Sequence, residues 1–282
     1  MRALETMIGL TFAAAACAGD APTVEPAGTT DGVAHYWVTS PYQAQRTKLR
    51  IIAPASATEK ENKRFLFVLP VEAREETHFG DGLDAVKKTG LHEKLGMIVV
   101  EPHFDKLPWY ADHPTDKGRQ DETYLLKAVL PEVDRLFPCK QPQRLLLGFS
   151  KSGWGAFSLI LRNPDVFAAA AAWDAPMTKS KPDQFGMNEA FATQENFEQY
   201  RITTLLREKG APFQQAKRLW LAGYDNFRTH TVDAHKLMDE HFPAVLHDYA
   251  DGPKRQHIWG SGWVEDAIRA LDALAGPARQ RP

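Results

Sequence analysis

Unbroken apolar segments alternate with segments of helical periodicity along most of this chain, and this alternation constrains the fold more than any other feature. A strand of a parallel sheet is buried on both faces, so its sequence is continuously apolar, as in RFLFVLPV at 64–71. The order of segments predicts an α/β fold with a mostly parallel sheet, helices on both faces and an antiparallel pair at its start. We expect strands at 35–40, 47–54, 64–71, 96–102, 144–150, 166–174, 217–225 and 244–250, and helices at 82–88, 121–136, 152–162, 231–241 and 262–274.

Length and composition fit one catalytic domain. A chain of 282 residues that is 43% hydrophobic can bury a single large core. We expect this domain at 34–276 and a short tail at 277–282. The connection at 176–216 is too long for a simple crossover and predicts a small lid-like insertion. Its aromatic residues either line a substrate cleft or form the insertion's own core: Phe185, Phe191, Phe197 and Tyr200.

The N-terminal region predicts export. Arg2 precedes an apolar run at 7–16 and then small residues, a pattern typical of a secretory leader and too short for a membrane-spanning helix. We expect a leader at 1–18 and a linker at 19–33. Two kinds of processing fit: signal peptide cleavage after ACA, or lipid attachment at Cys17, which would then be the protein's only link to a membrane. The protein would be periplasmic or extracellular; the alternative is a disordered tail on a cytoplasmic protein.

The charge balance gives no sign of a polyanionic partner. With 34 Lys and Arg against 36 Asp and Glu, the net charge is -2, which argues against nucleic-acid binding. No glycine-rich phosphate loop is present, so we expect no nucleotide cofactor. His and Asp residues gather at 103–116, but their spacing matches no zinc motif, and we expect neither a metal nor another cofactor. Because Cys17 belongs to the leader or carries a lipid, Cys139 has no partner for an intramolecular disulfide.

The segment GFSKSGWGA at 148–156 lies where an apolar strand meets a helix. In a nucleophile elbow the serine has a strained backbone and tolerates only small residues two positions before and after it. Gly148 and Ser152 occupy those positions around Ser150, although a serine in place of the usual glycine crowds the turn. Ser152 fits the nucleophile role less well because it lies inside the first helical turn. The amide of Lys151, at the helix N-terminus, is positioned to hold an oxyanion.

A serine nucleophile needs a base, and after such an elbow the chain order is serine, acid, histidine. His257, in HIWGSGW, follows the last expected strand. It is therefore the candidate base.

These segments resemble the α/β-hydrolase fold, and more narrowly the family of esterase D, feruloyl and acetyl-xylan esterases and mycolyltransferases. That family carries G-x-S-x-G-G-x-G-A at the elbow and His-x-Trp near the C-terminus. The residues that match are Gly148, Ser150, Gly153, Gly155, Ala156, His257 and Trp259. The resemblance spans about 64–270 and implies that Ser150 is the nucleophile and His257 the base. It does not specify a substrate.

Two aspartates compete for the acid that orients His257 and stabilises its imidazolium. Asp225 follows the strand before the last one and is the preferred candidate; Asp174, one strand earlier, is the alternative. Asp233 and Asp251 are weaker, because the first lies in an expected helix and the second in a loop.

The resemblance also implies a second oxyanion donor after the third strand, where many relatives have His-Gly. This chain has Pro70-Val71-Glu72, so we expect the amide of Val71 or Glu72 to act beside that of Lys151. Loops at the carboxyl edge of such a sheet bind ligands. The residues expected to contact substrate are His103, Trp109 and Trp154.

Together these residues predict a serine carboxylic ester hydrolase that forms an acyl-enzyme on Ser150. The resemblance favours acyl esters of carbohydrates or small alcohols as substrates. Two alternatives stay open: acyl transfer to another alcohol by the same acyl-enzyme, and a non-catalytic binding module, which Ser152 and the missing His-Gly make conceivable.

Overall fold

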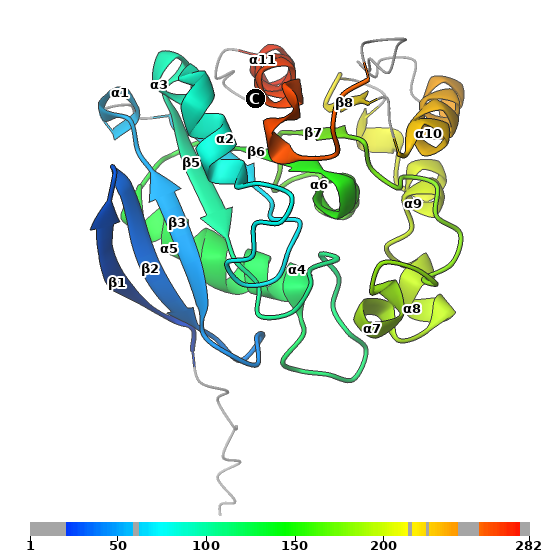
Figure 1. Cartoon of the computed structure of the whole chain (residues 1–282), viewed down its shortest axis with the longest axis horizontal. Coiled ribbons are helices and arrows are strands. Elements are labelled where there is room, and N and C mark those ends of the chain that lie inside the picture. The colour runs from blue at the N-terminus through cyan, green and yellow to red at the C-terminus, as the bar shows by residue number, and fades with distance from the viewer. Residues whose placement is uncertain (1–20, 59–61, 214–215, 224–225, 242–253, 277–282) are drawn as a thin grey trace, which may run out of the picture.

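One mixed sheet forms the centre of the computed structural model, which describes residues 21–58, 62–213, 216–223, 226–241 and 254–276 (Figure 1). Within these residues the sheet has eight strands in the order β1-β2-β3-β5-β4-β6-β7-β8. Strands β1, β2, β3 and β5 pair antiparallel, and β5, β4, β6, β7 and β8 pair parallel. The strands are β1 (Thr23–Thr30), β2 (Val33–Thr39), β3 (Thr47–Ile52), β4 (Arg64–Val68), β5 (Met97–Pro102), β6 (Gln143–Phe149), β7 (Ala169–Trp173) and β8 (Leu219–Ala222). The predicted α/β architecture is confirmed.

The expected linker at 19–33 is wrong for most of its length. Residues Thr23–Thr30 form β1, which pairs antiparallel with β2 from Thr23 opposite Thr39 to Thr30 opposite Val33. The linker was predicted because this segment contains Pro26 and Gly28. In the structure the pairing register shifts between these two residues. An edge strand tolerates such an irregularity because one of its sides pairs with no other strand. The antiparallel start of the sheet therefore contains three strands rather than two.

Helices cover both faces of the sheet and enclose two hydrophobic cores. One face carries α2 (Gly82–Thr89), α3 (Leu91–Leu95) and α11 (Trp263–Ala275), seen at the top of Figure 1. The other face carries α4 (Asp121–Tyr124), α5 (Leu130–Leu136), α6 (Ser150–Arg162), α9 (Ile202–Glu208) and α10 (Arg228–His241). The short helix α1 (Ala55–Thr58) follows β3, and the 3₁₀ turn η3 (Trp259–Ser261) precedes α11.

The expected helix at 121–136 is continuous, but its middle turn is wider than an α-helix. Residues Leu125–Val129 form the π-helical segment η1 between α4 and α5, and the amide of Leu130 donates to the carbonyl of Leu125. Pro131, which follows directly, has no N–H for the helical ladder. The helix therefore accommodates this proline with a wide turn, as π-bulges in helices do.

The expected insertion at 176–216 is helical. It contains α7 (Met187–Phe191), α8 (Gln194–Glu198), α9 and the 3₁₀ turn η2 (Ala211–Phe213), on the right of Figure 1. The expected leader at 1–18, the strand at 244–250 and the tail at 277–282 lie outside the described residues. Among the residues that are described, no helix is both long and apolar enough to span a bilayer.

Candidate active site

Ser150 lies at the sharp turn between β6 and α6. Its φ of 53° is in the left-handed region, which a residue with a side chain adopts only under strain. Gly148 is required because a Cβ there would overlap with the carbonyl of Ser152. The local sequence thus builds the elbow that was predicted, with Ser150 6% exposed at its tip.

The sequence had suggested that Ser152 crowds this turn, but in the structure it does not. Its hydroxyl is fully buried, accepts a hydrogen bond from the amide of Phe149 at 3.1 Å and donates to the carbonyl of Phe149 at 2.9 Å. A serine at this position therefore ties the first helical turn of α6 back to the end of β6. The departure from glycine stabilises the elbow.

His257 faces Ser150 from the loop before η3. Its Nε2 lies 3.0 Å from the Ser150 hydroxyl oxygen. Three aromatic rings surround the imidazole, with centroid distances of 5.1 Å to Phe149, 5.6 Å to Phe79 and 5.7 Å to Phe227. The amide of Trp259 donates to the carbonyl of Phe79 at 2.8 Å, which fixes this loop against the segment after β4.

Asp174 completes a chain of hydrogen bonds with His257. Its Oδ2 lies 2.6 Å from His257 Nδ1, and its Oδ1 accepts from the amide of Phe227 at 3.0 Å. Asp174 directly follows β7, has a φ of 44° and is buried. Gly223 is needed beside it, because a Cβ at Gly223 would lie 2.5 Å from the Asp174 amide nitrogen. The two corners at Ser150 and Asp174 therefore terminate neighbouring strands, β6 and β7.

The structure favours the second of the two acid candidates. Nδ1 of His257 has room for one strong acceptor, and Asp174 occupies that position. The preferred candidate, Asp225, lies outside the described residues. Asp233 lies on α10, as expected, and Asp251 is also outside the described residues. The sequence had ranked the two by the position usual in relatives, whereas the side chain that reaches His257 depends on how the corners after β7 and β8 pack.

The segment after β4 contains Val71 and Glu72, the two residues expected to supply the second oxyanion amide. The carbonyl of Pro70 accepts a 2.5 Å hydrogen bond from the hydroxyl of Tyr110, which is fully buried. Because a trans peptide is planar, this bond also fixes the direction of the Val71 N–H, opposite to the carbonyl. Among the described residues no group accepts a hydrogen bond from that amide. Gly155 leaves room for the Tyr110 ring, because a Cβ at Gly155 would overlap with that ring.

Glu72 has a structural environment of its own. Its buried carboxylate accepts from the Phe79 amide at 3.1 Å and lies 2.7 Å from His78 Nδ1. Lys151, next to the serine, has its ammonium 5.9 Å from the Phe79 ring centroid. Burial lowers the pKa of Lys151, and the charge of Glu72 opposes this shift. These side chains hold the segment 72–79 beside the elbow.

Two predicted substrate contacts need correction. Trp109 and Trp154 have no exposed surface, and their rings pack edge to face at 5.5 Å. The Trp109 indole N–H donates to the carbonyl of Phe185 at 3.1 Å, so this residue supports the insertion from beneath. Phe191, Phe197 and Tyr200 are buried with them and form the insertion's core.

Phe185 and His103 differ from these tryptophans. Phe185 is 49% exposed and is the one exposed large apolar side chain among the described residues. Its ring lies 5.9 Å from that of Phe227, which in turn contacts His257. His103, at the end of β5, is nearly buried but lines two surface cavities. Among the aromatic residues of the insertion, Phe185 is therefore the one placed to meet a ligand.

Comparison with known proteins places this site in a family. The model of the family described as "Putative esterase" matches residues 85–265, which include Ser150, Asp174 and His257. The chain belongs to this family. No sequence among the curated proteins matches the chain.

Solved structures of this esterase's fold include several hydrolases. An S-formylglutathione hydrolase from Agrobacterium tumefaciens has a TM-score of 0.68 at 16% identity, covering 89% of this chain and 100% of that chain. A ferulic acid esterase has a TM-score of 0.66 at 18% identity, covering 85% and 96%. The fluorophosphonate-binding serine hydrolase F of Staphylococcus aureus has a TM-score of 0.69 at 16% identity, covering 90% and 100%. At these identities the likeness shows the α/β-hydrolase fold, and the family match shows the esterase relationship.

Proposed function

We propose that this esterase is a serine carboxylic ester hydrolase with Ser150 as nucleophile, His257 as general base and Asp174 as the acid. The observation that carries this proposal is the unbroken sequence of hydrogen bonds from Asp174 to His257 Nδ1 and from His257 Nε2 to Ser150. Because Asp174 holds the proton of His257 on Nδ1, Nε2 keeps a lone pair directed at the serine hydroxyl. This is the tautomer in which a histidine accepts the serine proton.

In the first half of the proposed reaction, Ser150 attacks the ester carbonyl while its proton moves to His257. The tetrahedral intermediate then collapses, the bond to the alcohol oxygen breaks, and His257 returns the proton to that oxygen. The acyl group is now bonded to Ser150. In the second half, water attacks the acyl carbonyl while its proton moves to His257. The second tetrahedral intermediate then collapses, the bond to Ser150 Oγ breaks, and His257 returns the proton to Oγ as the carboxylic acid leaves.

Two backbone amides would hold the negative oxygen of the intermediate. The Lys151 amide lies at the start of α6, where the helix leaves its first N–H groups unpaired. The amide of Val71 is the second, since the Tyr110 hydroxyl orients the preceding peptide; Glu72 stays the alternative donor. Replacing Tyr110 by Phe removes this orienting bond. We expect kcat to fall about tenfold with little change in KM, less than the loss of a whole oxyanion donor. A KM effect alone would assign Tyr110 to substrate binding instead.

The substrate class remains the one that the sequence favoured, acyl esters of carbohydrates or small alcohols. Phe185 and Phe227 offer an apolar contact beside His257 for an acyl chain or ring. In the same proposal the protein is exported, as a secreted or Cys17-lipidated form.

A fluorophosphonate probe and an ester panel test the proposal. The wild-type protein should be labelled at Ser150 and should hydrolyse short-chain esters, while Ser150→Ala should lose both properties and keep its circular dichroism spectrum. The matched control is Ser158→Ala, a buried serine on the same helix. Near wild-type turnover in Ser150→Ala would overturn the proposal, and absence of labelling in the wild type would favour the binding module. Adding alcohols and measuring new ester as well as acid distinguishes hydrolysis from acyl transfer.

A further inference from the structure

A polar cavity of about 340 Å³ opens on the same edge of the sheet as the proposed active site. Its walls come from β2 and the start of β3, from the segment after β4 and from the segment after β5. The lining includes Trp37, Arg46, Lys48, Arg74, His103 and Asp105. Cavities of this volume are in the range that holds small-molecule ligands.

A second, much smaller cavity lies beside this one. It has a volume of about 20 Å³ and is lined by Val71, the proposed oxyanion donor, and by Trp259. Arg74 and His103 line both cavities. Strand β3 is separated from β6 by β5 and β4, so three strand spacings, about 14 Å, separate the polar cavity from Ser150 along the sheet edge. A substrate that occupied both the active site and the cavity would need a connecting chain of about that length, 14 Å.

Three cations line the polar cavity, but only two have a carboxylate partner. Lys48 Nζ lies 2.6 Å from a Glu75 oxygen, and Arg74 lies 3.1 Å from Asp105. The guanidinium of Arg46 lies 4.1 Å from the Trp37 ring centroid and forms an ion pair with no carboxylate of the described residues. Stacking uses the face of the guanidinium and leaves its in-plane N–H groups to bind an anion.

His103 supplies a second, independent sign of a ligand. Its side chain is 8% exposed, and its Nε2 lies 3.0 Å from Glu101, a carboxylate that also binds Arg50. Its Nδ1 is buried and has no hydrogen-bond partner among the described residues. A buried polar atom without a partner is costly in a folded protein unless a ligand or water satisfies it. Because Nε2–H donates to the Glu101 carboxylate, Nδ1 of the neutral ring is an acceptor, so a donor such as a hydroxyl of the substrate would satisfy it while the anionic group binds the cations.

We propose that this cavity binds an anionic group of the ester substrate, a carboxylate or a phosphate, about 14 Å from the ester carbon. The proposal rests on the proposed ester hydrolase and adds a charge requirement to its substrate. Arg46 supplies the uncompensated charge. Lys48 and Arg74 add donors, because exposed ion pairs such as that of Lys48 with Glu75 are weak and can be shared with a ligand.

Matched esters test the proposal. Three compounds share the reacting ester and a spacer of about 14 Å and end in a methyl ether, a carboxylate or a phosphate. Each is made twice, with the end group on the acyl side or on the alcohol side. In one of the two series we expect kcat/KM to be at least about tenfold higher for an anionic ester than for the neutral ester. Added salt should lower this ratio of anionic to neutral kcat/KM, because it screens the charges. The better of the two anions identifies the chemical source of the charge.

The variant Arg46→Gln should bring the ratio close to one and leave kcat/KM of the neutral ester unchanged. Arg269→Gln, on the exposed surface of α11, is the matched control and should leave the ratio as in the wild type. Equal kcat/KM for anionic and neutral esters in both series would overturn this inference, as would an Arg46→Gln variant that slows all esters equally. If the wild-type protein hydrolyses the neutral ester and Ser150→Ala does not, the proposed function holds whatever the result for the anionic esters. If no ester is hydrolysed at all, both proposals fall.

Discussion

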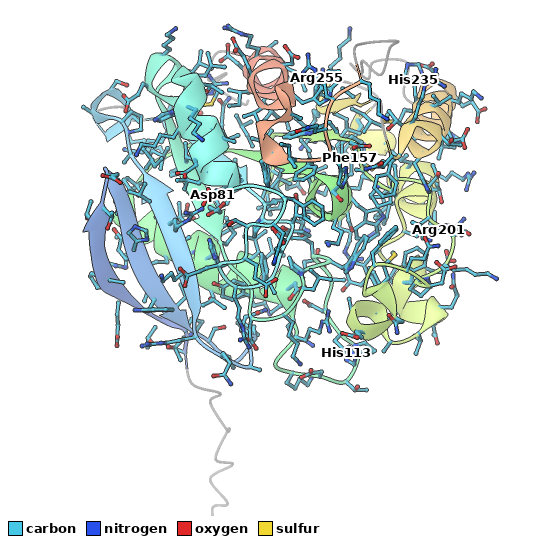
Figure 2. The ribbon with its side chains drawn as sticks, in the orientation of Figure 1. Asp81, His113, Phe157, Arg201, His235 and Arg255 are labelled. Atoms are coloured by element: carbon cyan, nitrogen blue, oxygen red, sulfur yellow. The ribbon has the colours of Figure 1, made fainter. Side chains whose placement is uncertain are left out.

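The two sides of the elbow are built from different chemistry. On the side of β3, which we call the charged flank, Arg50 binds Asp81 and Glu101, and Glu101 binds His103. On the side of the insertion, which we call the aromatic flank, the rings that pack together are those of Trp109, Trp154, Phe191 and Phe197. Figure 2 labels Asp81 toward β3 and Arg201 beside the helices of the insertion, with Phe157 of α6 between them.

This difference indicates a division of labour. Buried aromatic rings contribute mainly through packing, and Trp109 and Trp154 have no exposed surface with which to recognise a ligand. Buried ion pairs lose much of their attraction to desolvation, so a network such as Arg50 with Asp81 and Glu101 gains little as a source of stability. The aromatic flank therefore supports the site, and the charged flank is the side suited to recognise polar groups of a substrate.

The largest expected effect concerns the acid at the corner after β7. Asp174→Asn removes the charge that stabilises the His257 imidazolium and places an amide on Nδ1, so kcat should fall by about 10⁴ with the fold intact. Steady-state kinetics on a reactive ester measure this. Asp225→Asn is the control and should stay within a few-fold of wild type. If Asp225→Asn instead loses most of its activity while Asp174→Asn stays near wild type, the acid is Asp225, in the corner after β8.

Trp154→Ala tests whether the aromatic flank is structural. This side chain is fully buried between Trp109, Phe191 and Phe197, so its loss should lower the free energy of unfolding by about 3–5 kcal/mol. Urea denaturation gives the value. A small loss of stability combined with a large rise in KM would instead place Trp154 in the substrate site.

Asp121 connects the two flanks and should make stability depend on pH. Its buried carboxyl accepts from Gln43 at 3.2 Å and from the Trp109 amide at 3.3 Å, and burial raises its pKa to about 7. The folded protein therefore binds a proton more tightly than the unfolded chain does. This contribution to stability is complete below pH 4 and is lost as the pH rises through about 7, by up to about 1.4 kcal/mol per pH unit.

Urea denaturation of wild type and Asp121→Asn at pH 5, 6, 7 and 8 measures this loss. The difference in stability between the two proteins should move in favour of the variant as the pH rises. A difference that stays constant with pH would show that Asp121 ionises at its ordinary pKa.

The smallest expected effect is at the exposed edge of the aromatic flank. Phe185→Ala should change the free energy of unfolding by less than about 0.5 kcal/mol, because half of this ring is already in water. It should raise KM about three- to tenfold for esters with a long or aromatic acyl group, through the apolar area removed. An acetate ester is the control and should be unaffected. A KM change equal for both esters would mean that Phe185 acts through the shape of the loop.

Local sequence predicted the parts of this molecule that local physics decides. Helical periodicity located α2, α6, α10 and α11, and the small residues around Ser150 located the elbow. What the sequence missed depends on distant partners. Strand β1 contains a proline and a glycine, and its pairing with β2 overcomes their poor strand propensity.

The same distinction explains what the sequence left open or misjudged in the site. Asp174 and His257 are 83 residues apart, and no spacing rule shows which of two strand ends meets the histidine. Tyr110 gave no sign of its bond to Pro70, because 40 residues separate them. The burial of Trp109 and Trp154 could have been suspected, since the insertion supplied aromatic residues for them to pack against.

The position of Asp174 has a consequence for how this enzyme can diverge. With Asp174, directly after β7, as the proposed acid, the three proposed catalytic side chains depend on two adjacent strand corners and one C-terminal loop. The corner after β8 keeps two described tasks, the close approach of Gly223 to Asp174 and the Phe227 amide bond. In evolutionary terms, the described parts of this corner are therefore constrained through backbone contacts to Asp174 rather than through a reacting side chain.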